Sequence, residues 1–357
     1  MDLENVPLSL LGLTRGHLAE VLAPWIDRPF RVEQIYRAIY ERQVASFDEM
    51  TDLAAALRTT LSERFTIALP EIADRHVSAD STTKYLFRLG DGATIESVDI
   101  PDGDRRTFCL SSQAGCALGC RFCVTGFWGA GRNLDAGEIV AQVLAMRREP
   151  RPETHGLNLV FMGMGEPLLN LEALAEALEI LFEQISWRRI TVSTAGVVPG
   201  IEALARWPRR PQLAISLHAP DDARRSELMP INRSYPLAQL LAALQRYPLE
   251  PKQLLTFEYI LIGGFNDSLR DAETLASLLK GLRAKVNLIP LNPDAVLDPQ
   301  MQPPATERTD AFRRRLIEKG VQTTTRKQRG DDVSAACGQL RAPGREPRGF
   351  RRSPSTL

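Results

Sequence analysis

Strand-like apolar segments alternate with helical patterns from about residue 106 to residue 290. The strand-like segments cover residues 106–111, 157–162, 190–193, 212–218, 254–262 and 285–289. One helix between them should begin with a capping box, because Asp135 is followed three residues later by Glu138. The alternation predicts an α/β fold with a parallel sheet and right-handed crossovers, either an open doubly wound sheet or a partial barrel. In both architectures the functional residues lie at the carboxyl ends of the strands.

The first hundred residues follow a different pattern. Residues 15–65 carry three helical patterns, and residues 83–89 and 93–100 suit two strands joined by a turn at Gly90-Asp91-Gly92. The last residues carry arginines among Pro, Gly and Ser without an apolar period, which predicts disorder. The expected parts are a helical accessory domain (1–75), a β-hairpin extension (76–101), a core barrel domain (102–340) and a disordered basic tail (341–357).

Composition allows a large enzyme and leaves the partner open. The chain has 357 residues, 44% of them hydrophobic, and Lys plus Arg equals Asp plus Glu at 44 each. Because the total charge is balanced, an RNA-binding surface would have to come from local clusters of basic residues. No signal-peptide pattern or membrane-spanning apolar segment is found, so we expect a soluble, cytoplasmic protein without a membrane partner. The basic clusters are Arg188-Arg189, Arg206 with Arg209-Arg210, Arg224-Arg225, Arg313-Arg314-Arg315, and Arg326-Lys327 with Arg329.

Three of the five cysteines, Cys116, Cys120 and Cys123, form a CxxxCxxC motif. This spacing indicates reduced, functional thiols rather than a disulfide framework. A structural zinc site and an ordinary 4Fe-4S cluster both use four protein ligands, so a trio leaves one coordination position open for a cofactor. The alternative is a zinc site with Cys109 as the fourth ligand. The number of residues between Cys109 and Cys116 is, however, irregular for such sites.

Six segments in the expected order resemble the RlmN/Cfr family of radical S-adenosylmethionine (SAM) RNA methyltransferases. The similarity extends from the N-terminal helices to about Leu340, and Gly165-Glu-Pro-Leu-Leu-Asn and Arg329-Gly-Asp-Asp favour the RlmN type. The segments are CLSSQAGC (109–116), MGMGEPLLN (162–170), VST (192–194), LAISLH (213–218), NLIPLNP (287–293) and RGDDVSAACGQL (329–340).

The resemblance implies a fold, cofactors and a binding site. The fold would be a partial (β/α)6 TIM-like radical SAM barrel, with an N-terminal helical domain that contacts RNA and a small β extension. One 4Fe-4S cluster would be held by Cys116, Cys120 and Cys123 and by SAM, and two SAM molecules would be used per turnover. The residues implied to bind SAM are Gly165, Glu166, Ser193, Ser216, Leu217, His218 and Asn292.

The resemblance also implies a reaction. Cys337 would be methylated first and would then carry the methyl group to C2 of adenosine 2503 in 23S rRNA and of adenosine 37 in tRNAs. Glu96 would remove the ring proton, and Cys109 would attack the Cys337 sulfur to release the RNA and leave a disulfide. An electron donor such as flavodoxin would supply electrons.

Several alternatives stay open at this level. Cys337 lies between Gly330 and Gly338 and suits a mobile loop, but it could be an inert buried thiol. Cys109 could be structural, Glu96 a solvated side chain and His218 a structural histidine. The functional alternatives are a Cfr-type C8 methyltransferase, a radical SAM activase or carbon–carbon bond-forming enzyme, and a zinc-stabilised RNA-binding protein.

Overall fold

A ten-stranded sheet forms the centre of the molecule. The computed structural model describes residues 7–150 and 156–341, and the strand order in the sheet is β12-β11-β10-β9-β8-β7-β6-β5-β4-β3. The strands from β6 to β12 pair in parallel. They are β6 (Arg105–Cys109), β7 (Gly156–Phe161), β8 (Ile190–Thr194), β9 (Gln212–Ser216), β10 (Leu255–Leu261), β11 (Ala284–Pro290) and β12 (Gln322–Thr325).

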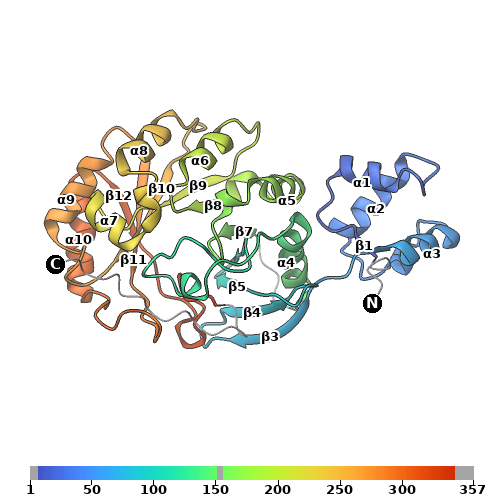
Figure 1. Ribbon diagram of the computed structural model, residues 1–357, viewed down its shortest axis with the longest axis horizontal. Coiled ribbons are helices and arrows are strands. Elements are labelled where there is room, and N and C mark those ends of the chain that lie inside the picture. Colours follow the sequence, from blue (N-terminus) through green and yellow to red (C-terminus); the bar gives the residue numbers. More distant parts are fainter. Residues whose placement is uncertain (1–6, 151–155, 342–357) are drawn as a thin grey trace.

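Helices connect each parallel strand to the next and lie mostly on the outer face of the curved sheet (Figure 1). The connecting helices are α4 (Ala136–Arg148), α5 (Leu171–Gln184), α6 (Val198–Ala205), α7 (Asp222–Leu228), α8 (Leu237–Arg246), α9 (Leu269–Leu278) and α10 (Thr306–Glu318). Six β/α units followed by β12 confirm the partial (β/α)6 barrel. The capping box is also confirmed, since the Asp135 side chain accepts a hydrogen bond from Glu138 N at 2.7 Å.

Short 3-10 helices lie in the connections and at the ends of strands. Pro167–Leu169 and Val124–Trp128 are the two that border the site described below. Within residues 7–150 and 156–341 the 3-10 helices are η2 (Phe47–Glu49), η3 (Val124–Trp128), η4 (Pro167–Leu169), η5 (Trp187–Arg189), η6 (Pro230–Arg233) and η7 (Asp331–Val333).

Three antiparallel strands extend the sheet beyond β6. They are β3 (Glu71–Val77), β4 (Thr83–Arg88) and β5 (Thr94–Asp102). The hairpin at Gly90-Asp91-Gly92 is present as predicted from the DG turn. Strand β3 was not expected, because it is largely exposed and carries few apolar residues. The boundary expected at residue 75 falls inside β3, so residues 71–75 belong to the sheet and not to the helical unit.

The N-terminal unit contains the three helices that the sequence predicts. They are α1 (Arg15–Leu22), α2 (Phe30–Tyr40) and α3 (Ala55–Arg64), with short strands β1 (Leu8–Ser9) and β2 (Phe65–Thr66) pairing in parallel. The unit lies beside α4 and α5 (Figure 1). Gly12 has φ +84°, and a Cβ on it would lie 2.0 Å from Gly137 N at the start of α4, so only glycine permits this approach.

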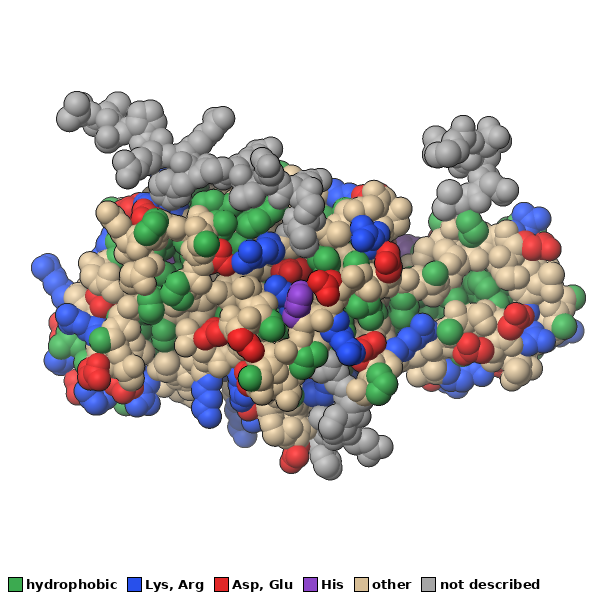
Figure 2. Space-filling view, turned by 90° about the horizontal axis from the view of Figure 1, so that it is seen from below, with side chains coloured by type: hydrophobic (Ala, Val, Ile, Leu, Met, Phe, Trp, Pro, Cys, Tyr) green, Lys and Arg blue, Asp and Glu red, His purple; other side chains and the backbone are tan. Residues whose placement is uncertain are grey.

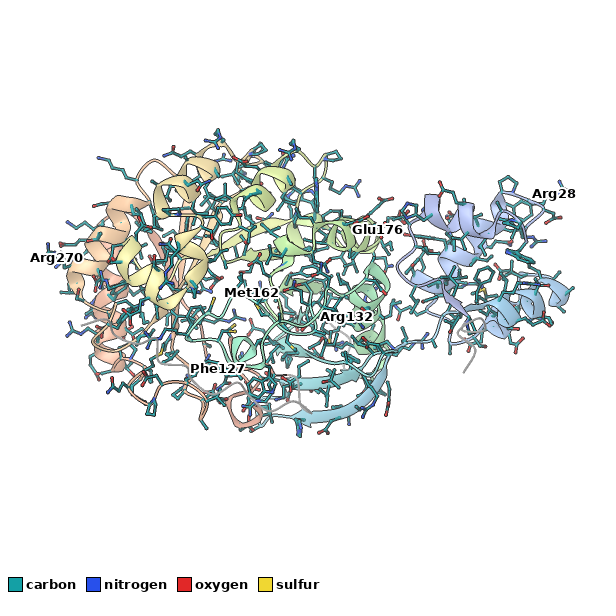
Figure 3. All side chains as sticks on the ribbon, viewed as in Figure 1. Arg28, Phe127, Arg132, Met162, Glu176 and Arg270 are labelled. Carbon is teal, nitrogen blue, oxygen red and sulfur yellow. The ribbon has the colours of Figure 1, made fainter. Side chains whose placement is uncertain are left out.

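An ion pair and a second polar contact join the same two parts. Arg15 Nη2 lies 2.8 Å from Glu183 Oε2, and His17 Nδ1 lies 3.3 Å from Glu176 Oε1. Figure 3 shows Glu176 on α5 at the side of the barrel nearest the N-terminal unit. Figure 2 shows acidic and basic side chains interspersed over one face of both parts. That face therefore offers mixed charge and no uniformly basic surface.

The segment after β12, residues 326–341, returns across the barrel and is called the Cys337 loop here. It contacts the β extension, where Ser78 Oγ donates to Asp332 Oδ1 at 2.5 Å and Gly330 N donates to Asp80 Oδ2 at 3.3 Å. Because residues 342–357 lie outside the described residues, the disordered tail expected there stays a prediction. No helix within residues 7–150 and 156–341 is long and apolar enough to cross a membrane.

Candidate active site

The three cysteines of the CxxxCxxC motif lie on one loop after β6. Cys116 N donates to Gly129 O at 3.0 Å, and Cys123 N donates to Cys120 O at 3.1 Å, which curls the loop back on itself. All three cysteines line a cleft of about 750 Å³, called the cluster cavity here. Val124 N donates to Gly338 O at 2.6 Å, so the loop also contacts the Cys337 loop.

The chemistry of this loop fits an iron–sulfur cluster. Burial raises the pKa of Cys116 to about 12 and raises the pKa of Cys120 and Cys123 as well, so bare thiolates would be unstable here. A coordinating metal removes the thiol proton outright. Among the described residues, no three His, Cys, Asp or Glu side chains are gathered to share a single ion.

Gly165 and Glu166 follow β7 and also line the cluster cavity. Gly165 has φ +98°, and a Cβ there would lie 2.5 Å from Gln113 Cβ. The buried Glu166 carboxylate accepts from Ala195 N at 2.7 Å and Leu168 N at 3.0 Å. Burial raises its pKa, while the backbone donors oppose that rise. The backbone thus fixes the carboxylate at the cavity wall, where lone pairs remain for a cationic ligand.

The ends of β8 and β9 contribute three of the other predicted SAM contacts. Ser193, Ser216 and His218 line the cluster cavity. His218 has φ 61°, and its Nδ1 accepts from Ile260 N at 3.1 Å. Burial lowers the pKa of His218 to about 3, so the ring is neutral. Leu217 is fully buried and does not line the cavity, and its backbone N–H donates to Glu258 O at 3.0 Å.

Two charged residues of this region were missed or misread from the sequence. Glu258 on β10 lines the cluster cavity and accepts from Asn287 Nδ2 at 2.8 Å. The signal was present, since it is the one acidic residue within the apolar strand 254–262. Arg225 was grouped with possible phosphate contacts, but it is 0% exposed. Its guanidinium donates to Ala195 O at 2.7 Å and Ser216 O at 3.1 Å, so these hydrogen bonds connect the ends of β8 and β9.

A second space, the cysteine cavity, lies next to the first. It is lined by Cys109 from the end of β6, Cys337, Met162, Asn292 and Arg326, among others. Cys337 and Met162 line both cavities, and Figure 3 shows Met162 inside the barrel. Asn292 is not brought together with the other predicted SAM contacts. Its Nδ2 instead donates to Cys337 O at 3.2 Å.

Glu96 on β5 lines neither cavity. Its buried carboxylate accepts from Arg341 N at 2.8 Å, so it contacts the Cys337 loop directly. Lys84 on β4 forms a buried ion pair with the same carboxylate. Burial raises the pKa of Glu96, and Lys84 and Arg341 oppose that rise. Glu96 is therefore not the solvated side chain that an alternating strand would otherwise suggest.

An open α/β barrel with three partly buried cysteines on one loop, which share a cleft with polar groups from the ends of successive strands, defines a radical SAM enzyme. Residues 110–279 match the radical SAM superfamily, and residues 8–67 match the ribosomal RNA large subunit methyltransferase N-terminal domain.

Full-length relatives narrow the class. The dual-specificity RNA methyltransferase RlmN of Anaeromyxobacter sp. (strain Fw109-5) is 46% identical over 96% of this chain and 91% of its own length. The probable dual-specificity RNA methyltransferase RlmN of Gemmatimonas aurantiaca is 47% identical over 91% of this chain and 89% of its own. The crystal structure of a radical SAM methyltransferase from Sphaerobacter thermophilus superposes with a TM-score of 0.87 at 46% identity, covering 94% of this chain and 99% of that one. The chain belongs to the RlmN family of radical SAM methyltransferases. The family implies a 4Fe-4S cluster and SAM as cofactors.

Proposed function

We propose that the protein methylates C2 of adenosine in RNA, with adenosine 2503 of 23S rRNA and adenosine 37 of tRNAs as substrates. One observation carries the proposal. Cys337 lines both the cluster cavity and the cysteine cavity, and Cys109 lines the second. A cysteine that borders both spaces can receive a group on one side and be attacked by a second cysteine on the other. The RlmN names of the full-length relatives support the RNA substrate.

The cofactor site is proposed on the residues around the cluster cavity. Cys116, Cys120 and Cys123 would hold the cluster, and SAM would lie against Gly165, Glu166, Ser193, Ser216 and His218. When bound, the two groups supply a 5'-deoxyadenosyl radical, which side chains cannot generate. Leu217 would contribute through its place beside Ser216 and His218, and Asn292 through its bond to the Cys337 backbone.

Cys337 is the proposed methyl carrier. Its sulfur accepts a methyl group from one SAM molecule, and a second SAM is used to remove a hydrogen atom from that methyl. The remaining carbon radical on Cys337 adds to the adenine ring, which joins the RNA covalently to the protein. A radical is needed because a carbon of the adenine ring is not a nucleophile and cannot displace the SAM methyl group directly.

Glu96 and Cys109 complete the proposed reaction. The radical adduct would give up one electron to the bound cluster, and Glu96 removes the ring proton, a role supported by its buried carboxylate and its contact with the loop that carries Cys337. Cys109 then attacks the Cys337 sulfur, which forms a disulfide and releases the RNA. An external reductant reopens the disulfide, and an electron donor such as flavodoxin supplies the radical step.

RNA recognition is proposed for unstacked bases. An adenine that reacts at C2 must leave its stack and enter a pocket, which suits single-stranded rRNA and the tRNA anticodon loop. The N-terminal helical unit is the proposed additional RNA contact, supported by the match of residues 8–67 to an N-terminal domain of rRNA methyltransferases.

One experiment tests the function and its nearest alternative. The protein is reconstituted anaerobically with iron and sulfide, then incubated with SAM, a reductant and either an rRNA fragment or tRNA. Mass spectrometry of the nucleosides should detect 2-methyladenosine, and a Cys120→Ala variant should yield none. Recovery of 8-methyladenosine would assign the C8 reaction instead. An intact cluster without any methylated adenine would overturn the methyltransferase proposal. Methylation by protein loaded with zinc alone would overturn the assignment of an iron–sulfur cluster.

A further inference from the structure

Arg326 belongs to the basic cluster Arg326-Lys327 with Arg329, whose three residues all line the cysteine cavity. It follows β12 directly, and its backbone N–H donates to Leu288 O at 2.8 Å in β11. Its guanidinium lines the cysteine cavity together with Cys109 and Cys337. Nη1 lies 3.7 Å from Met162 Sδ, a residue that borders both cavities.

The charges facing Arg326 come from three elements. Cys337 on its own loop, Cys109 on β6 and Glu258 on β10 all act on the guanidinium, with Cys337 first, and together they raise the pKa of Arg326. Glu258 is held in place by Asn287, whose Nδ2 donates to its Oε2. A fixed carboxylate and the two sulfurs are therefore the groups that act on this cation.

The neighbouring Arg329 is placed differently, although it also lines the cysteine cavity. Arg329 Nη2 lies 3.1 Å from Asp102 Oδ1, and its Nη1 lies 3.8 Å from Asp80 Oδ2. These carboxylates belong to the β extension and turn its charge away from the sulfurs. Arg329 is thus a matched control for Arg326: the same residue type, three positions away, at the same cavity.

Cys109 needs such a cation if it is to act as a nucleophile. The thiolate and not the thiol attacks sulfur. Burial and the Cys337 sulfur raise the pKa of Cys109, Arg326 opposes both effects, and the net result is a pKa of about 12. Without Arg326 the pKa of this thiol would be higher still, and the fraction present as thiolate at neutral pH would be smaller.

We propose that Arg326 is a positioning residue that stabilises the Cys109 thiolate for its attack on the Cys337 sulfur. This role rests on the proposed function. In the step, the Cys109 electron pair forms the S–S bond and the bond between the Cys337 sulfur and the methylene carbon breaks. The carbon keeps that electron pair and takes up a proton, which balances the proton that Cys109 has lost to solvent. The two sulfurs are oxidised and the carbon is reduced.

The first test measures the thiol directly and does not depend on activity. In the cluster-loaded protein with Cys337→Ala, which prevents disulfide formation, Cys109 is modified with methyl methanethiosulfonate at pH 7 to 10 and followed by mass spectrometry. Arg326→Gln should slow the modification about tenfold at pH 8, the effect of a pKa rise of about one unit. Arg326→Lys should recover most of the rate, and Arg329→Gln should leave it unchanged.

The second test follows the reaction. With SAM, reductant and RNA, the Arg326→Gln variant should accumulate a covalent protein–RNA adduct. The Arg326→Lys variant should release the RNA and accumulate no adduct. An unchanged Cys109 rate in a folded, cluster-loaded Arg326→Gln protein would overturn the proposal. The proposal would also be overturned if Arg326→Gln bound RNA more weakly while the Cys109 modification rate stayed the same, since Arg326 would then be a phosphate contact. Failure of the proposed function is distinguishable, because the wild-type protein would then form no methylated adenine and no adduct, whatever the thiol test gives.

Discussion

Lys84 Nζ lies 3.1 Å from Glu96 Oε1, and the two side chains are only 8% and 5% exposed. The pair joins neighbouring strands β4 and β5, and Lys84 Nζ also donates to Ser334 O at 3.4 Å in the Cys337 loop. A buried carboxylate keeps its charge only when a cation or several donors compensate for the lost water. Lys84 therefore connects the protonation state of Glu96 with the position of the loop that carries Cys337.

Lys84→Met should raise the pKa of Glu96 further, because burial then acts without its main opposing charge. If Glu96 is the base, the acid limb of the single-turnover methylation rate should move up by about one pH unit or more. Lys84→Arg keeps the charge and should retain the wild-type limb. If Lys84→Met and the wild-type protein had the same pH profile, the proposed effect of Lys84 on the pKa of Glu96 would be contradicted.

The same pair has a stability consequence whose sign is fixed by the raised pKa. A carboxyl group whose pKa is higher in the folded state stabilises it below the unfolded pKa, and this contribution is lost as the pH rises through the folded pKa. Lys84→Met leaves the Glu96 charge uncompensated and should lower the free energy of unfolding by about 3 kcal/mol at pH 7. Urea unfolding at pH 4.5 should show a smaller loss, since the raised pKa means that more of Glu96 is protonated there than at pH 7.

Cys109→Ala should stop the reaction after RNA has been joined to the protein. The buried Cys109 lines the cysteine cavity with Cys337, and its removal takes away the sulfur that would release the RNA. A covalent protein–RNA adduct should then be visible by denaturing electrophoresis and mass spectrometry. Cys337→Ala is the matched control and should form no adduct. Normal release of methylated RNA by Cys109→Ala would show that another group performs the attack.

His218 should make the protein sensitive to acid. Its pKa is lowered to about 3, so the unfolded state binds more protons between that pH and the ordinary pKa of histidine. Stability is therefore complete above about pH 6.5 and is lost as the pH falls. Asparagine tolerates the positive φ at this position. Between pH 7 and pH 5, the free energy of unfolding of His218→Asn should fall by about 2 kcal/mol less than that of the wild-type protein. The free energy of unfolding at both pH values measures this difference, and equal losses would contradict it.

Gly165→Ala should damage the SAM side of the cluster cavity. The added Cβ would lie 2.5 Å from Gln113 Cβ at a backbone φ of +98°, and Gln113 Oε1 accepts from Glu166 N at 2.8 Å. We expect a loss of about 2 to 4 kcal/mol in the free energy of unfolding, together with weaker SAM binding by calorimetry. Gly264→Ala is the control, because it has φ +72° but nothing within 4 Å of the added Cβ. It should lose only about 1 kcal/mol and bind SAM normally.

Local patterns were sufficient for most of the core. The strand and helix periods of residues 106–290 predicted the parallel sheet, and Asp135 with Glu138 predicted the start of α4. The cluster loop was also visible, because its three cysteines lie within eight residues and need no distant partner to be recognised. Strand β3 escaped prediction, since its side chains are mostly exposed and its pairing with β4 leaves no apolar alternation.

The sequence by itself determined the alternating α/β core, the hairpin and the three clustered thiols, because each depends on residues that are close along the chain. Only the tertiary structure decided which charges face the reacting groups. Lys84 meets Glu96 across two strands, and Arg326 meets Cys109 from a segment more than two hundred positions away. Burial decides whether such a charge matters, since a cation acts strongly on a thiol or carboxyl only where water is excluded. Burial is a property of the packed barrel and cannot be read from any short segment of the chain.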